Sequence, residues 1–386
     1  MAVGLEDDLI IAVDGTGQFG SEWTDESVRT IDAKGMTVMP GLINMHDHLA
    51  MRDLIGNPIW EVEAGIVKLT LNGIRNALTA LRRGWTTVRD LGAPDGIALK
   101  LRDLIAEGQM PGPRVIACGS PICVTGGHGW PVCAEVDGPD NVRRVAREQF
   151  KQGADYIKVM ASGDPHHMPG EEQTIPEMTL AEIRAAFEEA ELRGKHTACH
   201  AMGTTALANV LEAGVDVVSH GFYLNAELAE RMARQGAYLD PTLSSYGIQT
   251  INPKRNRGEQ WIEDHQVLLE PMKESFAAAL AADVKIVVGT DTGGFFSEDL
   301  ALMREFGMAP MDSLVAATKN CADAMKVGDR LGTIEQGKIA DIVILGSDPL
   351  EDPHHIEDVV LVIKQGVAMR PDEINLDDRD FLAALR

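Results

Sequence analysis

Two histidines at the end of a short apolar segment are the first residues in the chain whose spacing indicates metal chemistry. The segment Pro40–Asn44 leads almost directly into His46-Asp47-His48. In a β-strand, the side chains of residues i and i+2 lie on the same face. His46 and His48 would therefore converge on one point, which suits a borderline divalent metal such as zinc. A structural or surface pair of histidines is the alternative at this position.

Four further polar residues lie within or directly after apolar segments that favour strands. They are Lys158, His200, His220 and Asp291. A buried lysine is costly unless it gains a counter-charge, reaches solvent or is chemically converted. Carboxylation by CO₂ would make Lys158 an anionic oxygen ligand that bridges two cations. Each residue alone is more simply explained as a core, capping or strand-end side chain, but together the six favour a shared site.

The segments that must position these residues alternate between two kinds of pattern. Candidate strands are Thr37–Asn44, Thr86–Leu91, Arg114–Gly119, Tyr156–Ala161, His196–His200, Asp216–His220, Ala237–Pro241 and Lys285–Thr290. Candidate helices are Glu61–Arg83, Asn141–Lys151, Thr179–Arg193, Thr204–Glu212, Ala226–Arg234 and Glu259–Ala282. Thr179 followed by Glu182 indicates a capping box at the start of one helix.

This alternation of strands and helices predicts an α/β fold with a parallel sheet. About eight units over roughly 250 residues favour a closed (β/α)₈ TIM barrel over a doubly wound open sheet. Barrel enzymes place their active sites at the carboxyl ends of the strands. All six candidate residues are expected there.

The chain ends have a different pattern of short alternating strands and turns. Ile10–Val13, Asp341–Leu345 and Val359–Lys364 are the candidate strands. We expect them to form a small β-sandwich domain built from both chain ends. The predicted organisation is residues 1–37 for its N-terminal part, 38–328 for the barrel and 329–386 for its C-terminal part.

Charge and composition restrict the class of partner. Lys and Arg number 35 against 59 Asp and Glu, which gives a formal net charge of −24 over 386 residues. This excess repels nucleic acid phosphates and anionic lipid, so we expect a small-molecule substrate and no nucleic acid or membrane partner. The five cysteines are odd in number and form no CxxC pair. We therefore expect buried free thiols and a cytoplasmic location. The assembly that we expect is a homo-oligomer.

A glycine-rich segment near the N-terminus matches the dinucleotide-binding fingerprint. Gly15–Gly20 reads Gly-Thr-Gly-Gln-Phe-Gly after a candidate strand. The fingerprint requires a helix to begin at its end, whereas Ser21–Asp32 is polar and has no apolar helical stripe. We expect a turn between β-strands, and a nucleotide-dependent oxidoreductase is a minor alternative.

The ordered set His-x-His, Lys, His, His, Asp resembles that of the amidohydrolase superfamily, in the subtype with two metals. The resemblance extends from the Pro-Gly-Leu-Ile segment through Gly289-Thr-Asp291 to Gly332–Val343. Within the superfamily, Gly126-Gly-His-Gly129, Tyr156–Gly163 and His220-Gly221 are most similar to the imidazolonepropionase-like branch of Xaa-Pro dipeptidases and acyl-amino-acid carboxypeptidases.

The resemblance implies a role for each candidate residue. His46, His48 and Asp291 would hold the more buried metal, and His200 and His220 the more exposed one. A carboxylated Lys158 would bridge the two divalent ions, with zinc as the default. His128 and Tyr223 match positions that help to hold the substrate. The segment Ser162–His167 departs from the branch, and His166 and His167 would contact substrate or lie in a solvated loop.

The implied mechanism is hydrolysis of an amide-type bond. Two nearby divalent ions lower the pKa of a bridging water, and the resulting hydroxide attacks the carbonyl. Asp291 accepts the proton and returns it to the departing amine. Cleavage beside a free carboxylate, in a dipeptide or an N-acyl amino acid, is the leading hypothesis. A xenobiotic amide, carbamate or urea is the first alternative, and a metal-free scaffold of the same fold is a lower one.

Overall fold

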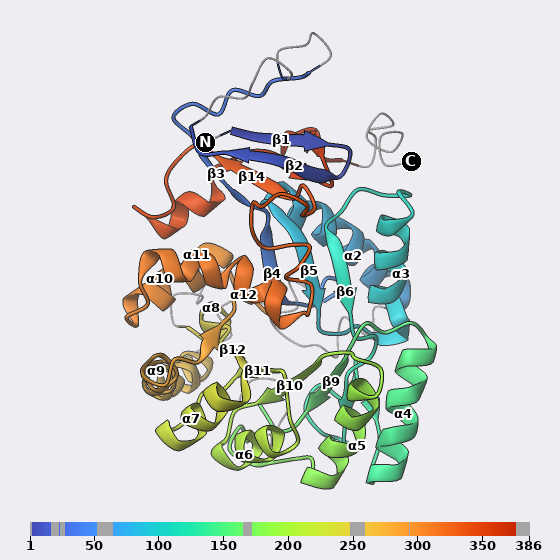
Figure 1. Cartoon of the computed structure of the whole chain (residues 1–386). Coiled ribbons are helices and arrows are strands. Elements are labelled where there is room, and N and C mark those ends of the chain that lie inside the picture. Colours follow the sequence, from blue (N-terminus) through green and yellow to red (C-terminus); the bar gives the residue numbers. More distant parts are fainter. Residues whose placement is uncertain are drawn as a thin grey trace.

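The computed structural model describes residues 2–16, 23, 28–51, 65–164, 172–247, 259–292 and 294–375. The segment with His166 and His167, most of Gly15–Gly20 and the side chains of residues 259–266 lie outside this description. Figure 1 shows a large α/β body with a small group of strands at one end, close to both termini.

The body contains parallel strands that follow one another in chain order. One sheet holds β4 (Leu42–Asp47), β5 (Trp85–Asp90) and β6 (Arg114–Ala117). The other holds β9 (Ile157–Met160), β10 (Thr197–Ala201), β11 (Val217–His220), β12 (Tyr238–Asp240) and β13 (Lys285–Ile286), with β7 (Ile122–Cys123) and β8 (Ala134–Glu135) at its far edge. All of these pairings are parallel.

Backbone hydrogen bonds at two seams close these strands into a barrel. At one seam the Asp155 amide donates to the Ala117 carbonyl at 2.8 Å. At the other the Met45 amide donates to the Val288 carbonyl at 2.8 Å, and the Thr290 amide donates to the His46 carbonyl at 3.1 Å. The structure therefore confirms the expected (β/α)₈ barrel.

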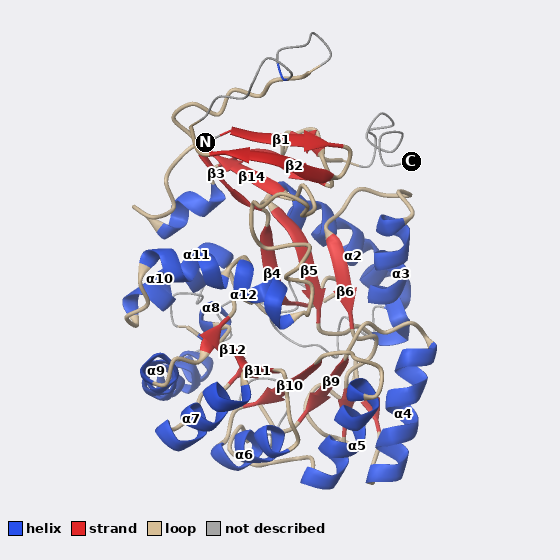
Figure 2. Ribbon diagram, in the orientation of Figure 1, coloured by secondary structure: helices blue, strands red, loops and turns tan. Residues whose placement is uncertain are grey.

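Helices follow the strands and cover the outside of the barrel (Figure 2). The helices are α2 (Gly65–Arg82), α3 (Ile97–Ala106), α4 (Pro139–Lys151), α5 (Leu180–Glu191), α6 (Thr204–Glu212), α7 (Ala226–Gln235), α8 (Leu243–Tyr246), α9 (Glu259–Ala281), α10 (Phe296–Glu305), α11 (Pro310–Ala316) and α12 (Lys319–Ala324). The predicted capping box is present at the start of α5, where Thr179 and Glu182 exchange hydrogen bonds. None of the described helices is both long and apolar enough to cross a bilayer.

The small β domain is built from both chain ends, as expected. A hairpin of β1 (Ala2–Glu6) and β2 (Leu9–Asp14) lies beside a four-stranded sheet of β3 (Thr37–Pro40), β14 (Ile342–Leu345), β15 (Val359–Lys364) and β16 (Val367–Met369). Backbone hydrogen bonds join the hairpin to the segment before β14: the Ile10 amide donates to the Lys338 carbonyl, Gly337 to Ile10 and Ala340 to Asp8, each at 2.8 Å.

The expectation of one continuous strand over Thr37–Asn44 is wrong. The structure divides this segment at Gly41 into β3, which pairs with β14, and β4, which belongs to the barrel. The Gly41 amide donates to the Asp341 carbonyl at 2.8 Å. A Cβ atom at position 41 would overlap the Thr86 side chain, so glycine permits the close passage between the two domains.

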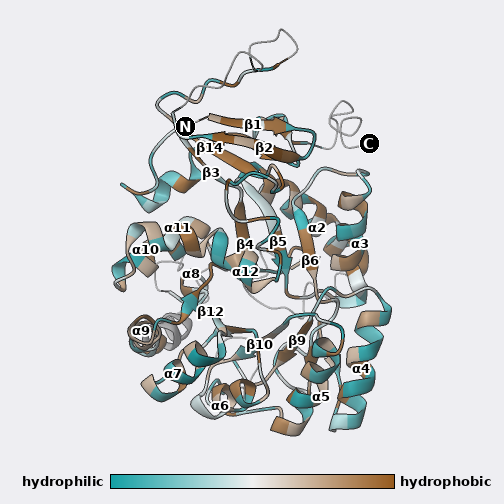
Figure 3. Cartoon of the chain, viewed as in Figure 1, coloured by the Kyte–Doolittle hydropathy of each residue, from teal (hydrophilic) through white to brown (hydrophobic). Residues whose placement is uncertain are grey.

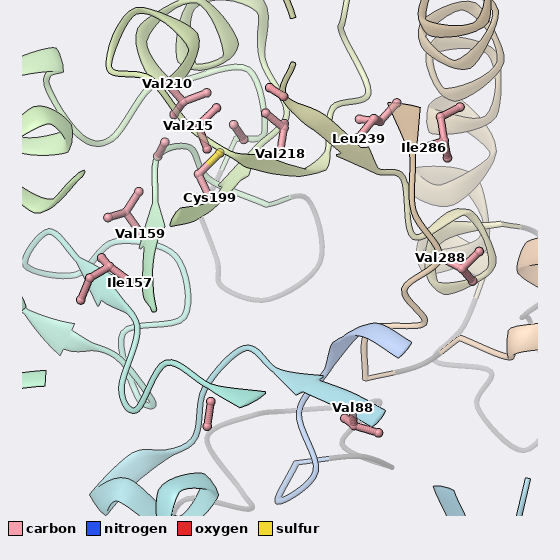
Figure 4. Packing of buried hydrophobic residues seen from close by; sticks show 14 of the residues in the cluster. Val88, Ile157, Val159, Cys199, Val210, Val215, Val218, Leu239, Ile286 and Val288 are labelled. Carbon is pink, nitrogen blue, oxygen red and sulfur yellow. The ribbon is translucent and has the colours of Figure 1, made fainter. Parts of the chain in front are cut away.

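Every residue of β9, β10 and β11 is buried, and the alternation of side-chain direction along a strand determines which of them point inward. Ile157, Val159, Cys199, Val218 and Leu239 pack in the hydrophobic cluster between strands and helices (Figure 4). Figure 3 shows β9 and β10 as largely hydrophobic and α4 as largely hydrophilic, in keeping with a helix that has one face in water. Since strand side chains alternate, the intervening residues Lys158, His200, Ser219 and Asp240 face the barrel interior.

All five cysteines are free thiols. Cys118, Cys123, Cys199 and Cys321 are buried, as expected, but Cys133 is only half-buried because it lies in the segment next to β8.

The seam between β4 and the segment after β13 gives a testable prediction. A Cβ atom on Gly289 would overlap the His46 Cβ and the Asp240 carboxylate. We therefore expect Gly289→Ala to lower the free energy of unfolding by about 1–3 kcal/mol, the usual cost of overpacking a filled interior. Chemical denaturation measures this, with Gly15→Ala as the control because a Cβ there would meet nothing within 4 Å. Equal stability of both variants would contradict the prediction.

Candidate metal centre

Three histidines and one carboxylate converge at the carboxyl ends of β4, β11 and β13. His46 Nε2 lies 3.6 Å from one Asp291 oxygen, and His48 Nε2 lies 3.8 Å from the other. The ring centroids of His46 and His220 are 5.3 Å apart. His46, His220 and Asp291 offer ligand atoms that all lie within 4.8 Å of one another. The strand-end positions predicted from the sequence thus meet at one place.

The other ring nitrogen of each histidine is held by a buried partner. His46 Nδ1 lies 2.9 Å from Asp240 Oδ2, His48 Nδ1 donates to the Gly92 carbonyl at 2.8 Å, and His220 Nδ1 lies 2.7 Å from Thr242 Oγ1. A carbonyl can only accept, so the Nδ1 of His48 carries a proton, and its Nε2 is the nitrogen that faces Asp291. This is the arrangement that orients metal-ligating imidazoles.

Burial favours the neutral form of three histidines in this region. Removal from water lowers the pKa of His46, His200 and His220 well below the usual value. The neighbouring imidazoles add to this effect at His220, where His200 and His46 are the next contributors. Neutral imidazoles are the form that binds a metal ion.

Backbone strain is concentrated at the same end of the barrel. His220, Thr242 and Asp291 have φ values of 70°, 45° and 54°. Residues with a Cβ rarely adopt this left-handed region, least of all a β-branched threonine. Two of these residues converge in the cluster and the third holds His220 Nδ1, so the strained turns after the strands aim the site's side chains.

Lys158 lies within the barrel and does not reach solvent. It is 2% exposed, and its Nζ donates to Ser219 Oγ at 3.3 Å. Burial is the main cause that lowers the pKa of Lys158 to about 8, and the Arg89 charge acts in the same direction. The alternative of a lysine snorkelling to water does not apply.

A second group adjoins the first around His200. His128, Asp164 and His200 bring ligand atoms within 4.8 Å of one another, and the His200 and His220 rings are 4.6 Å apart. His128 stacks on His200 with centroids 4.1 Å apart and planes at 27°. An imidazole binds an ion in its ring plane, along the lone pair, so near-parallel stacking is an unfavourable arrangement for sharing one ion. A role for His128 in substrate binding stays a prediction.

Three residues of this region were not predicted from the sequence. Asp164 is fully buried and accepts a hydrogen bond from Tyr246 Oη at 2.6 Å. The Tyr246 ring lies 5.2 Å from that of His220. Asp240 lies within the predicted strand Ala237–Pro241. It follows Tyr238 by two residues, and this spacing, which places both side chains on the same face of a strand, was the signal for it. No local pattern marks Asp164 or Tyr246.

Tyr223 lies apart from the converging histidines in its described contacts. Its side chain is half-buried, and its hydroxyl accepts a hydrogen bond from Gln173 Nε2 at 3.3 Å. A role for Tyr223 in substrate binding stays a prediction. His166 and His167 lie outside the described residues, and Gly15 and Thr16, the described part of the glycine-rich segment, form a turn after β2.

The donor set fits a divalent metal ion. It combines imidazole nitrogens, each fixed through the other nitrogen of its ring, with an adjacent carboxylate in a buried mouth. Such nitrogen and oxygen ligands are those used by zinc and neighbouring divalent ions.

Comparisons with known proteins identify a family for this chain. The model of the amidohydrolase family matches residues 37–369. Ochratoxinase from Aspergillus niger is 29% identical over 357 residues, which cover 82% of this chain and 71% of that protein. A Xaa-Pro dipeptidase solved with bound methionine is 28% identical with a TM-score of 0.84, covering 95% of this chain and 94% of that one. A prolidase complexed with N-methylphosphonate-L-proline is 27% identical with a TM-score of 0.85, covering 95% and 94%.

The bond between His46 and Asp240 gives a second prediction. Asp240→Asn replaces a charged acceptor by a neutral amide, which holds and polarises the imidazole less well. We expect the affinity for Zn²⁺ to fall about 10- to 100-fold, measured by competition with a chromogenic chelator. Asp352→Asn is the matched control, because Asp352 also bonds a histidine, His354 at 2.8 Å, but both are exposed. Unchanged affinity in Asp240→Asn would contradict the assigned role of Asp240.

Proposed function

The chain belongs to the amidohydrolase family, and we propose that it is a metal-dependent hydrolase of an amide-type carbon–nitrogen bond. The favoured substrates are small molecules, either dipeptides or N-acyl amino acids, cleaved next to a free carboxylate. The observation that carries the proposal is the convergence of His46, His48 and His220 on Asp291 with their Nδ1 atoms already held. The cytoplasm and a homo-oligomer stay predictions from the sequence.

We assign the metal ligands as follows. His46, His48 and Asp291 would hold the more buried ion, and His200 and His220 would hold the more exposed one. Lys158, carboxylated on Nζ by CO₂, would be a ligand shared by both, and zinc is the proposed ion. The complete burial of Lys158 supports this assignment, because a modified anionic lysine beside cations removes the cost of a lone buried ammonium.

The residues around the ions then have distinct tasks. When bound, the ions supply a water of lowered pKa and polarise the scissile carbonyl. Asp291 holds the proton lost by the attacking water and delivers it to the leaving nitrogen. Its 13% exposed side chain opens on the mouth of the barrel, where substrate must enter. His128 donates from its ring to the oxygen that gains charge.

A second substrate class has support from one feature of the structure. The solved relatives named above carry methionine or a proline analogue, which favours recognition of an amino acid. Asp164, however, places a buried carboxylate beside His128. A substrate carboxylate bound there would be repelled. A xenobiotic amide, carbamate or urea without a carboxylate is therefore the alternative, and a metal-free scaffold is the lower one.

Two substitutions test the proton transfer and the ligand assignment together. Asp291→Asn keeps the shape of the side chain but cannot take up a proton, so we expect kcat to fall about 10²- to 10⁴-fold while metal content is retained. Lys158→Ala should lose at least one ion as well as turnover. Metal analysis beside steady-state kinetics separates the two cases. An active Asp291→Asn variant would show that the proton-shuttle assignment is wrong, and metal-free wild-type protein would favour the scaffold.

Matched substrates test the requirement for a carboxylate. An N-acyl amino acid and its carboxamide differ only in one charge. If the free carboxylate is recognised, kcat/KM should fall at least about 30-fold on capping, the kinetic equivalent of losing roughly 2 kcal/mol from a desolvated charge pair. Equal rates, or faster cleavage of aryl carbamates and ureas, would support the alternative substrate class.

A further inference from the structure

Arg89, on strand β5, is an arginine sealed inside the barrel. Its side chain is fully buried, and none of its three guanidinium nitrogens has a hydrogen-bond partner among the described residues. The neighbouring Val88 belongs to the hydrophobic cluster between strands and helices (Figure 4). Arg89 therefore faces the interior. A buried guanidinium is ordinarily paired, since its charge is costly to remove from water.

The aromatic rings packed next to Arg89 supply no negative charge. The guanidinium carbon lies 4.5 Å from the centre of the Tyr156 ring. The ring of His196 stacks on that of Tyr156, with centroids 4.5 Å apart and planes at 14°. The Tyr156 hydroxyl donates to the backbone carbonyl of Asp90 at 2.7 Å. Burial raises the pKa of Tyr156 and lowers that of His196, so both rings are neutral.

Arg89 and Lys158 are both buried side chains that face the barrel interior. Tyr156 precedes Lys158 by two residues on the same inward face of the chain. The Arg89 charge acts on Lys158, His46 and Asp240, and it is the largest of the influences that oppose burial in setting the pKa of Asp240. Asp240 Oδ1 likewise has no hydrogen-bond partner in the described structure. An unmodified Lys158 would place a second buried cation beside Arg89.

We infer that Arg89 is the buried counter-cation of carboxylated Lys158 and favours that modification. The inference rests on the proposed function, in which a carboxylated lysine lies between the ions. An anion on Lys158 turns the repulsion between two buried cations into an attraction. Arg89 touches neither substrate nor the reacting bond, so it is a positioning residue.

The chemistry of the modification explains why one fixed cation has a large effect. The ammonium of Lys158 first loses a proton, and the Nζ lone pair then forms a bond to the carbon of CO₂. One carbon–oxygen π bond breaks, its electron pair goes to oxygen, and nitrogen loses a second proton. The products are a carbamate anion and two protons, with CO₂ as the co-reactant. The charge on the side chain changes by two units, and each unit interacts with Arg89 in a poorly screened interior.

The test compares wild-type protein, Arg89→Met and Arg89→Lys, each with Zn²⁺ and a series of ¹³C-labelled bicarbonate concentrations. Carbon-13 NMR reports the carbamate, and metal analysis reports the ions. We expect Arg89→Met to need about tenfold or more bicarbonate for half-maximal carbamate, and Arg89→Lys to need less than Arg89→Met because it keeps the charge. Saturating bicarbonate should restore both the carbamate and the metal content of Arg89→Met.

Tyr156→Phe is the matched control. It keeps the ring under Arg89 and removes the hydroxyl with its hydrogen bonds to the Asp90 carbonyl and the Cys118 thiol, so its bicarbonate dependence should equal that of wild type. If Arg89→Met shows wild-type dependence, or loses metal without rescue by bicarbonate, the inference is overturned; the second outcome would mean that Arg89 serves Asp240 or packing. A wild-type protein that binds Zn²⁺ without any carbamate signal would instead refute the bridging lysine in the proposed function.

Discussion

Closure of the barrel is the constraint on which the site depends. Residues from the first strand and from the segment after the last one become neighbours only when the two edges of the sheet bond. The His46 carbonyl accepts from the amides of both Thr290 and Asp291, at 3.1 and 2.8 Å. The same backbone bonds that close the sheet therefore place the Asp291 carboxylate against the rings of His46 and His48. An open sheet of identical strands would leave the first histidines and the last aspartate at opposite edges.

Closure of the barrel also buries polar and titratable side chains in its interior. The outward side chains of β9 to β12 are apolar and pack under the helices, but the inward ones include Lys158, His200, Ser219 and Asp240. Burial shifts each titratable group toward neutrality: it raises the pKa of Asp240 to about 7 and lowers that of the histidines. Cations bound at the mouth would favour the charged carboxylates and keep the imidazoles unprotonated. The polar side chains of the interior are thus suited to positive charge bound at the carboxyl ends of the strands.

The sequence predicted most of the residues that converge, because strand periodicity and the position of strand ends are local properties. Apolar segments that end in a residue type able to bind a metal ion predict His46, His48, His220 and Asp291. The capping box of Thr179 and Glu182 was predictable for the same reason. Asp164 and Tyr246 were not, because their contact spans distant segments and Tyr246 lies on the single turn α8. The split at Gly41 also depends on pairing with β14, a strand from the far end of the chain.

The periodicity of its strand does not mark Arg89 as a functional residue, although we infer that it acts on Lys158 in the site. Its segment, Trp85–Asp90, is a predicted strand, yet an arginine on a strand is usually explained by an exposed face or an edge. Only the closed barrel shows that this one is 0% exposed. An unmodified, protonated Lys158 would add a second cation to the interior that holds Arg89, beside the carboxylates of Asp240 and Asp291 that also act on it. The proposed carboxylation would instead give Arg89 an anionic neighbour, and no sequence pattern indicates such a change in side-chain chemistry.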